Sequence, residues 1–142
     1  GGYKDGATTD NTYFIHQNTF KDCVNLQTFY IQHGSMLQKD IDNAAFTYTP
    51  NLTNLLIISY GRVTGAIPNL SSCTSLSYLH LHYNNFSSGT PNFAANSNIN
   101  YVNLSYNKLT GAIPSYKNLS NLLQLYLHNN KFTSLGTFQN LP

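Results

Sequence analysis

The chain contains near-copies of one segment at a constant spacing. Residues 105–114 nearly repeat residues 59–68, and a looser copy lies between them at residues 82–91. The apolar positions that anchor the copies are 23 residues apart and continue into a fourth copy: Val63, Phe86, Leu109 and Phe132. Regular repeats of this length stack into a solenoid. A solenoid is suited to presenting an extended surface rather than to enclosing a catalytic pocket.

Aliphatic residues precede each copy at matched offsets. The pattern L-x-x-L-x-L-x-x-N-x-L runs from Leu76 to Phe86 and recurs at residues 99–109 and 122–132. This spacing resembles the leucine-rich repeat, which has a period of about 20–29 residues. The tail Leu-Thr-Gly-Ala-Ile-Pro at residues 109–114 is similar to the plant-type subclass found in receptor-kinase ectodomains and polygalacturonase-inhibiting proteins. Residues 20–26 instead resemble the leucine-rich repeats of microbial surface proteins.

The resemblance implies an α/β-type repeat solenoid that is mostly β. We expect a right-handed coil with one parallel sheet on its concave face and little or no regular helix. The alternation L-x-L agrees with this, because alternate residues of a half-buried strand point inward. Five or six strands are expected near residues 13–15, 29–31, 56–58, 79–81, 102–104 and 125–127. Residues 39–50 are expected to form a longer convex loop.

An asparagine follows three of these strands, at Asn84, Asn107 and Asn130. A buried asparagine can use its amide to satisfy backbone groups of a turn that the sheet leaves unpaired. Gly61 occupies this place in the preceding repeat and cannot form that bond.

The register of the strand before Gly61 is open to two interpretations. The upstream spacing predicts that Leu55 and Ile57 point into the core, whereas the downstream match predicts Leu56 and Ile58. A slip of one residue reverses every side chain of a strand. The downstream match is longer, so we predict Leu56 and Ile58 as core residues. Leu79, Leu81, Val102, Leu104, Leu125 and Leu127 are predicted to be almost fully buried.

Composition limits the domain organisation and the partners. The 142 residues are expected to form one repeat domain of about five to six repeats over residues 12–142, after a flexible lead-in at residues 1–11. We expect the repeats to continue beyond the C-terminus. Charged residues make up only 8% and the net charge is +2, which argues against nucleic acid as a partner. The apolar runs are too short to insert into a membrane. Low charge with abundant Asn, Ser, Thr and Tyr is typical of extracellular or cell-surface proteins.

The two cysteines, Cys23 and Cys73, occupy the first apolar position of their repeats. Equivalent residues in neighbouring strands are about 4.8 Å apart, so two repeats would separate these cysteines by roughly 10 Å. Disulfides need Cα atoms within about 6.8 Å of each other. Both cysteines are therefore predicted to be buried free thiols.

The outward positions of the strands, and those directly after them, form the predicted recognition surface. They carry uncharged side chains with aromatic rings or hydrogen-bonding groups, which suit a protein or a glycan ligand. Ile57, Ser59 and Phe14 also fall in these positions. The candidate ligand-binding residues are Tyr30, Tyr60, Tyr78, His80, His82, Tyr83, Tyr101, Asn103, Tyr106, Tyr126 and His128.

Catalysis and metal binding find little support in this pattern. His80 and His82 share one face and could share a metal, but no third ligand is predicted near them. No carboxylate pair or acid-supported histidine beside a nucleophile is apparent. We therefore expect no enzyme activity, no cofactor and no metal.

Two functions from different classes remain. The first is an extracellular recognition or adhesion module that binds a carbohydrate or a protein through its concave face. The second is a structural segment of a fibre, stalk or surface layer that self-associates end to end. Exposed apolar repeat ends and unpaired strand edges favour the second function.

Overall fold

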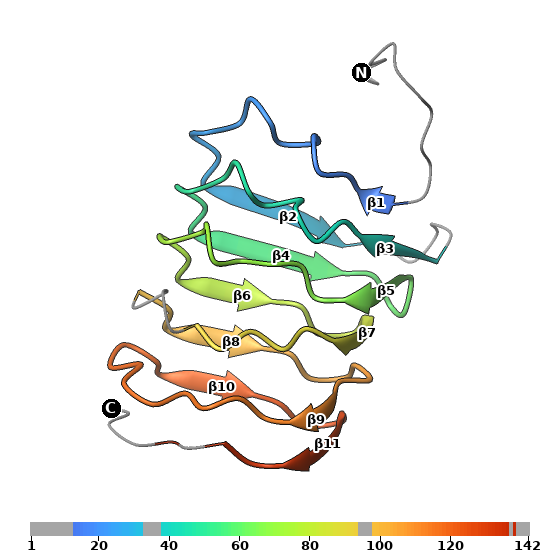
Figure 1. The fold of residues 1–142 in the computed structure, drawn as a ribbon, viewed down its shortest axis with the longest axis vertical. Coiled ribbons are helices and arrows are strands. Elements are labelled where there is room, and N and C mark those ends of the chain that lie inside the picture. Colours follow the sequence, from blue (N-terminus) through green and yellow to red (C-terminus); the bar gives the residue numbers. More distant parts are fainter. Residues whose placement is uncertain (1–12, 33–37, 94–97, 137, 139–142) are drawn as a thin grey trace.

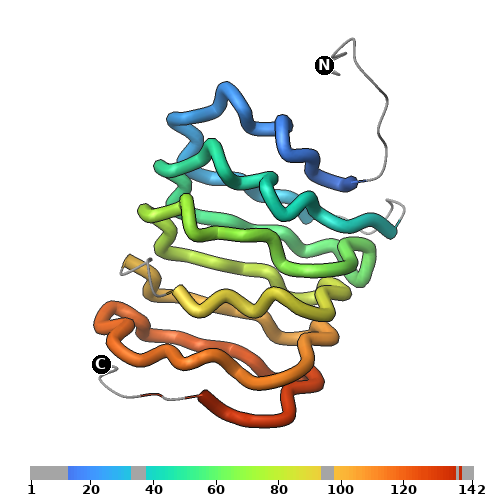
Figure 2. Tube along the Cα trace, in the orientation of Figure 1, coloured from blue at the N-terminus to red at the C-terminus, as the bar shows by residue number. Residues whose placement is uncertain are grey.

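The computed structural model describes residues 13–32, 38–93, 98–136 and 138. In this part of the chain, eleven short strands and the turns between them form a solenoid of stacked coils without helix (Figure 1). The tube trace shows successive coils lying one below the other from the N-terminal to the C-terminal side (Figure 2). The predicted lead-in at residues 1–11 lies outside the described residues. Within the described residues, no helix is long and apolar enough to cross a membrane.

One strand from each coil contributes to a five-stranded parallel sheet, which corresponds to the predicted concave-face sheet. Its strands pair in the order β10-β8-β6-β4-β2, with consecutive strands of the sheet one coil apart in sequence. Leu79 of β6 pairs with Val102 of β8, which pairs with Leu125 of β10, as the 23-residue period predicts. The strands are β2 (Thr28–Gln32), β4 (Asn54–Ile58), β6 (Tyr78–His80), β8 (Tyr101–Asn103) and β10 (Gln124–Tyr126).

The remaining strands form two further parallel sheets that the sequence did not reveal. A four-stranded sheet has the order β1-β3-β5-β7, and a two-stranded sheet joins β9 to β11. Two of these strands, β5 and β9, contain the Thr-Gly-Ala part of the repeated tail. Their bounds are β1 (Tyr13–Ile15), β3 (Lys39–Ile41), β5 (Val63–Ala66), β7 (Asn85–Ser88), β9 (Thr110–Ala112) and β11 (Lys131–Ser134).

Two sequence-based assignments near the N-terminus are wrong because the residues concerned belong to the four-stranded second sheet. Strand β1 pairs with β3 and not with β2, so Phe14 does not belong to the concave-face sheet. The expected loop over residues 39–50 begins with strand β3, because Lys39 N donates to Arg62 O at 3.0 Å and joins the next coil. Residues Lys39–Ile41 of the expected loop therefore belong to the second sheet.

The core lies between the sheets, and its burial depends on the position in the stack. Leu79, Leu81, Val102 and Leu104 are at most 1% exposed, as predicted. Leu125 and Leu127 were predicted to be almost fully buried but are only partly buried. Strand β10 is the edge of its sheet in the described residues, so no following coil covers these two leucines.

The predicted core residues of β4 need a correction. Leu55 pairs with Leu79 and Leu56 pairs with His80, so Leu55 and Ile57 point into the core and Leu56 lies on the outer face. Ile58 is also largely buried, at 9% exposure. The physical cause is one extra residue: eight positions separate Leu55 from Val63, whereas seven separate Leu79 from Phe86. The upstream and downstream repeats are each in register, and the insertion lies between them.

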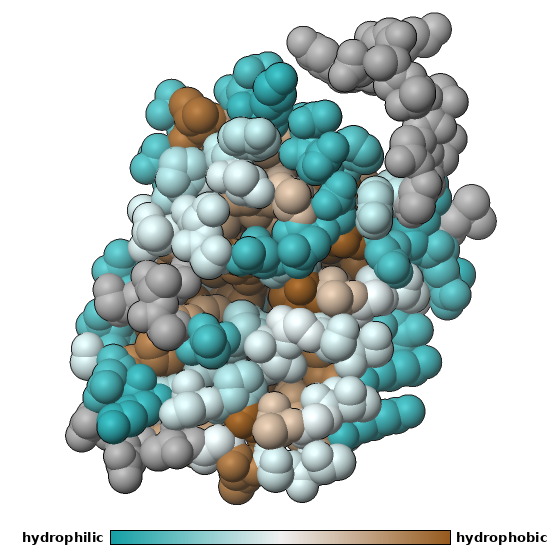
Figure 3. Space-filling view, viewed as in Figure 1, coloured by the Kyte–Doolittle hydropathy of each residue, from teal (hydrophilic) through white to brown (hydrophobic). Residues whose placement is uncertain are grey.

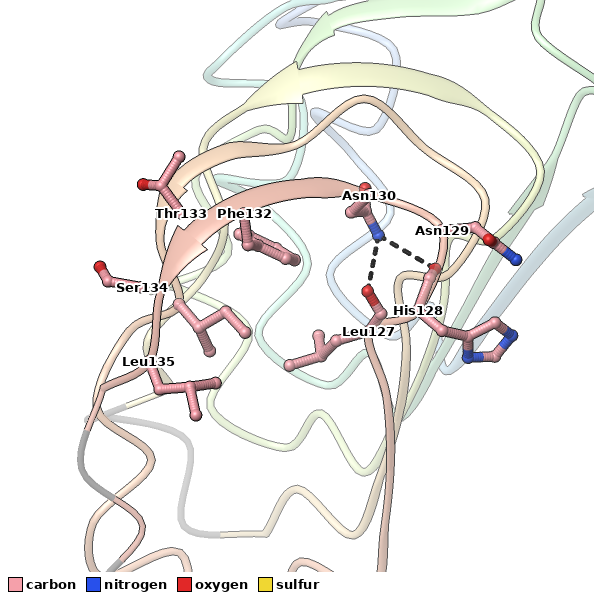
Figure 4. A pocket seen from close by; sticks show the side chains of 9 residues that line it. Leu127, His128, Asn129, Asn130, Phe132, Thr133, Ser134 and Leu135 are labelled. Carbon is pink, nitrogen blue, oxygen red and sulfur yellow. Dashed lines mark hydrogen bonds between the residues drawn. The ribbon is translucent and has the colours of Figure 1, made fainter.

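The asparagines form a ladder of hydrogen bonds, as predicted. The Asn107 side chain donates to Leu81 O at 2.8 Å and Leu104 O at 3.1 Å, and its Oδ1 accepts from Phe86 N at 3.1 Å. Asn130 donates to Leu127 O at 3.1 Å in the same way, and Figure 4 shows its amide beneath the last turn. Each asparagine therefore joins its own turn to the preceding coil.

Ser59 extends this ladder into the coil in which Gly61 replaces asparagine. Its Oγ accepts hydrogen bonds from Val63 N at 2.8 Å and Arg62 N at 3.1 Å, and it donates to Asn84 Oδ1. Ser59 is only 1% exposed. The inserted residue turns this hydroxyl inward, so Ser59 is not the surface contact that the sequence suggested.

The two cysteines differ, although both are free thiols. Cys73 is buried, with Sγ 3.6 Å from both Phe46 O and Thr49 Oγ1, and burial raises its pKa. Cys23 was also predicted to be buried but is exposed. It lies in a turn in which every residue from Lys21 to Asn25 is exposed, whereas Cys73 packs against the preceding coil.

Candidate functional site: an aromatic surface on the concave-face sheet

Nine of the eleven candidate residues form one connected group of rings, which we call the aromatic surface. They lie on the outer positions of β6, β8 and β10 and in the turns that follow β4, β6, β8 and β10. Every ring in this group lies within 6.4 Å of another, measured between centroids. The aromatic surface consists of Tyr60, Tyr78, His80, His82, Tyr83, Tyr101, Tyr106, Tyr126 and His128.

The turn residues form the first row of the aromatic surface. Tyr60 stacks on Tyr83 with centroids 6.1 Å apart, and Tyr83 stacks on Tyr106 at 4.5 Å. His128 ends the row, with its ring at 82° to Tyr106 and 5.3 Å away. The period of the solenoid aligns the three tyrosines, because each occupies the same position in its coil, and His128 lies one position earlier in the last coil. The ring faces are therefore turned toward neighbouring coils.

The strand residues form the second row. Tyr101 is central: it stacks on His80 at 4.2 Å and on Tyr78 at 6.1 Å, and its centroid is 5.7 Å from Tyr126. His82 connects the two rows, because its ring lies 5.3 Å from Tyr83 and 6.3 Å from His80. The two rows therefore make one continuous surface across four coils.

The tyrosines of the first row have an unusual backbone. Tyr60, Tyr83 and Tyr106 have φ angles of 53–55°, in the left-handed region. Bulky side chains rarely adopt this conformation, whereas asparagine, which occupies the same position at Asn129 (φ 55°), adopts it more easily. Backbone strain of this kind persists only where the surrounding structure enforces it, and it clusters at binding sites. The turn orients three exposed phenol rings in the same direction.

The other two candidate residues lie next to the aromatic surface without ring contacts to it. Tyr30 on β2 donates from its hydroxyl to Gln32 Oε1, and Gln32 Nε2 donates to the Tyr60 hydroxyl at 2.9 Å. Asn103 accepts from Ser105 N at 3.1 Å and Ser105 Oγ at 2.7 Å. Tyr30 is thus tied to the aromatic surface by hydrogen bonds, and Asn103 supports the turn after β8.

The sequence missed one residue on this face and included others wrongly. Leu56 lies on the outer face between Tyr30 and His80, where Ile57 had been placed. Ser59, placed on this face by the sequence, is buried, at 1% exposure. The spacing of eight residues instead of seven between Leu55 and Val63 was the available signal, but it does not locate the insertion.

The electrostatic character of this face is neutral. The outer positions of β2, β4, β6, β8 and β10 carry no Asp, Glu, Lys or Arg. Burial lowers the pKa of His82, and burial together with the charge of His82 lowers the pKa of His80, from an ordinary value of 6.5. Both histidines are therefore neutral near pH 7. Within the described ranges, no group of three or more His, Cys, Asp or Glu residues could hold a metal ion.

One open hollow lies mostly outside the aromatic surface. An open hollow of about 410 Å³ at the C-terminal edge is lined by Leu127, Asn130, Phe132 and neighbouring residues, and only His128 belongs to both it and the aromatic surface (Figure 4). On the side seen in Figure 3, hydrophilic and intermediate residues predominate and the hydrophobic ones form separate spots. The tyrosines of the first row are open to solvent, with Tyr60 58% and Tyr83 and Tyr106 each 41% exposed, which suits an extended ligand.

The comparisons with known proteins agree with this geometry. The leucine rich repeat family matches residues 75–96 and 98–116. The solenoid is also similar to the ectodomain of the receptor kinase SOBIR1 from Arabidopsis thaliana, with 26% identity, a TM-score of 0.63, and coverage of 78% of this chain and 69% of that one. The chain is a leucine-rich repeat protein. Its repeats are of the type found in plant receptor ectodomains.

Two further solved structures share the leucine-rich repeat fold. One is the BIR3–SERK2 complex from Arabidopsis thaliana, with 27% identity and a TM-score of 0.62, covering 72% of this chain. The other is the plant peptide hormone receptor RGFR1 in complex with RGF2, with 30% identity and a TM-score of 0.68, covering 81% of this chain. The chain spans 56% of the first protein and 18% of the second. No curated protein sequence matches the chain.

Proposed function

We propose that this chain is a non-catalytic recognition module of an extracellular or cell-surface protein. It binds a peptide or a protein segment through the aromatic surface. The observation that carries the proposal is the continuity of this surface: nine rings, each next to another, six of them exposed and none with a formal charge near pH 7. Tyrosine rings lose little conformational entropy on binding and combine apolar area with a hydroxyl group, which makes them frequent binding hot spots.

The backbone of the tyrosine row supports the same function. Folding does not need tyrosine at these turns, because Asn129 makes the equivalent turn in the last coil. Three left-handed tyrosines are a cost to stability that a binding role explains. The similarity to a peptide hormone receptor solved with its peptide points in the same direction, as an analogy of fold.

The geometry favours a peptide over a glycan that stacks on the rings. Two van der Waals contacts of about 3.5–4 Å each require roughly 7–8 Å between two ring planes that enclose a sugar. The centroids of Tyr83 and Tyr106 are 4.5 Å apart, and those of His80 and Tyr101 are 4.2 Å apart. The interior ring faces are thus occupied by each other. Ring edges and hydroxyl groups remain for the ligand, and these suit the side chains and amides of a polypeptide.

A library of random peptides displayed on phage and selected against the purified chain tests this function. Peptides bound by the wild type should lose at least about tenfold in affinity when Tyr83→Ala and Tyr106→Ala are combined. Tyr48→Ala is the matched control, because Tyr48 is equally exposed, at 42%, but lies outside the concave-face sheet. Selected peptides that bind all three proteins equally would place recognition elsewhere.

Assembly through the repeat ends is a second candidate function. Leu123 and Leu135 in the last coil are each 75% exposed, next to the partly buried Leu125 and Leu127. Association through this edge would cover all four. Light scattering over a range of concentrations distinguishes the two functions, because end-to-end association predicts a mass that rises with concentration and a monomer does not.

A further inference from the structure

The β4 coil carries two aliphatic side chains where every other strand of the sheet presents polar or aromatic ones. Leu56 is partly exposed and pairs with Tyr30 on one side and His80 on the other. Ile58 pairs with Gln32 of β2. Among the described strands of this sheet, Leu56 and Ile58 are the only aliphatic residues at outer-face positions. They form a local apolar floor at one end of the aromatic surface.

A hydrogen-bonded strap borders this floor. The Tyr30 hydroxyl donates to Gln32, and Gln32 Nε2 donates to the Tyr60 hydroxyl at 2.9 Å. Tyr30 and Tyr60 are the most exposed tyrosines described, at 55% and 58%. The strap restrains the side chains of Tyr30 and Tyr60, and a side chain that is ordered before binding costs less entropy on binding. The strap also explains the low exposure of Ile58, which lies beside Gln32.

We propose that Leu56 and Ile58, bordered by Tyr30, Gln32, Tyr60 and His80, form a subsite for one aliphatic side chain of an uncharged peptide segment. The inference rests on the proposed function and adds the specificity of one ligand position. A charged ligand side chain at this place would lose hydration without gaining a partner, since no charged residue borders the subsite. The Gln32 amide and the phenol hydroxyls can bond the ligand backbone around the buried side chain.

The one-residue insertion follows this subsite in the chain. In β6 and the turn after it, the corresponding outer residues are His80 and His82, which belong to the aromatic surface. The insertion turns Ser59 inward to the asparagine ladder while Leu56 stays on the outer face. The β4 coil thus differs from its neighbours both in the core, at Ser59, and on the outer face, at Leu56 and Ile58. The remainder of the aromatic surface supplies contact area that depends less on the ligand sequence.

The experiment compares peptide selections against the wild type and two variants. Wild-type selection should yield peptides with one position restricted to Leu, Ile, Val or Met. Leu56→Asn should remove this restriction and weaken the selected peptides by roughly tenfold. Leu56→Phe, which keeps the floor apolar but fills it, should shift the preference toward Ala and Gly. Leu135→Asn is the control, because that leucine is 75% exposed and follows β11 on the other side of the coil.

The outcomes separate this inference from the proposed function. If the selected peptides require Tyr83 and Tyr106 but show no aliphatic position, the subsite is wrong and the recognition surface stands. The same holds if Leu56→Asn and Leu135→Asn behave alike while circular dichroism shows both variants folded. If no selected peptide depends on Tyr83 and Tyr106, the proposed function itself fails.

Discussion

The coils of β6 and β4 bond an equivalent backbone group, the N–H of Phe86 or of Val63, with different side chains. In the β8 coil, the Asn107 amide bonds two carbonyls and the amide hydrogen of Phe86. In the β4 coil, Gly61 has no side chain to offer, and the Ser59 hydroxyl accepts from Val63 N and Arg62 N. The comparison teaches that the buried backbone groups of the turn must be bonded, whereas the residue that bonds them can change. One inserted residue is enough to bring the substitute into place.

The largest effect is expected from the core columns, which test the register of β4. Leu104→Ala in the regular repeats and Ile57→Ala in β4 should each lower the free energy of unfolding by about 2–5 kcal/mol, because each leaves a cavity in a fully packed column. Leu56→Ala should cost about 1 kcal/mol or less. Urea denaturation measures all three. Equal losses for Leu56→Ala and Ile57→Ala would contradict the register described here.

The next effect concerns the two ways of closing the turn. Asn107→Ala should cost about 3 kcal/mol and Ser59→Ala about 2 kcal/mol, because each leaves buried backbone groups without partners. Both side chains are at most 8% exposed, so water cannot easily replace them. Ser71→Ala removes an exposed hydroxyl and serves as the control in the same urea experiment. If Ser59→Ala is as harmless as Ser71→Ala, the hydrogen bonds of the Ser59 hydroxyl do not stabilise this turn.

A smaller effect tests whether asparagine can be restored at position 61. Gly61 has φ +87°, whereas Asn84, Asn107 and Asn130 are not in the left-handed region. Gly61→Asn should therefore cost about 1 kcal/mol through the backbone alone, since a Cβ there would meet no atom within 4 Å. It should not rescue Ser59→Ala, and thermal melts of the double variant should show additive losses. Recovery of stability in the double variant would mean that the turn relaxes to the regular geometry.

The smallest expected effect is on the pH dependence of the free energy of unfolding. The histidines of β6 and of the turn after it contribute to this dependence, whereas the aliphatic residues of β4 do not. The pKa values of His80 and His82 are lowered in the folded chain, so below pH 6.5 the unfolded chain binds more protons than the folded chain. Their neutral forms favour folding above that pH, and this contribution is lost as the pH falls from 6.5 through the lowered values.

A variant that copies β4 tests this prediction. His80→Leu combined with His82→Ile introduces the side chains that β4 carries at the corresponding outer positions. Its free energy of unfolding between pH 7.5 and 5, measured with urea, should vary less than that of the wild type (the two values span the ordinary histidine pKa of about 6.5). An unchanged slope would exclude these histidines as its source.

The sequence by itself determined the repeat, the sheet and most of its outer face. A hydrophobic period of 23 residues places Leu79, Val102 and Leu125 in one column, and alternation along each strand then turns Tyr78, His80, Tyr101 and Tyr126 outward. The asparagine ladder also followed from the sequence, because a turn has few other ways to satisfy its buried backbone groups.

Tertiary structure decided the irregular and terminal parts. The position of one inserted residue is set by which strands pair, and that pairing turned Leu56 outward and Ser59 inward. The strands of the further sheets are only three or four residues long and lack a regular alternation of buried and exposed residues, so they carry little local pattern. The burial of Cys23 and Leu127 depends on what covers each end of the stack. The spacing of residues along the chain does not show which residues become neighbours in space.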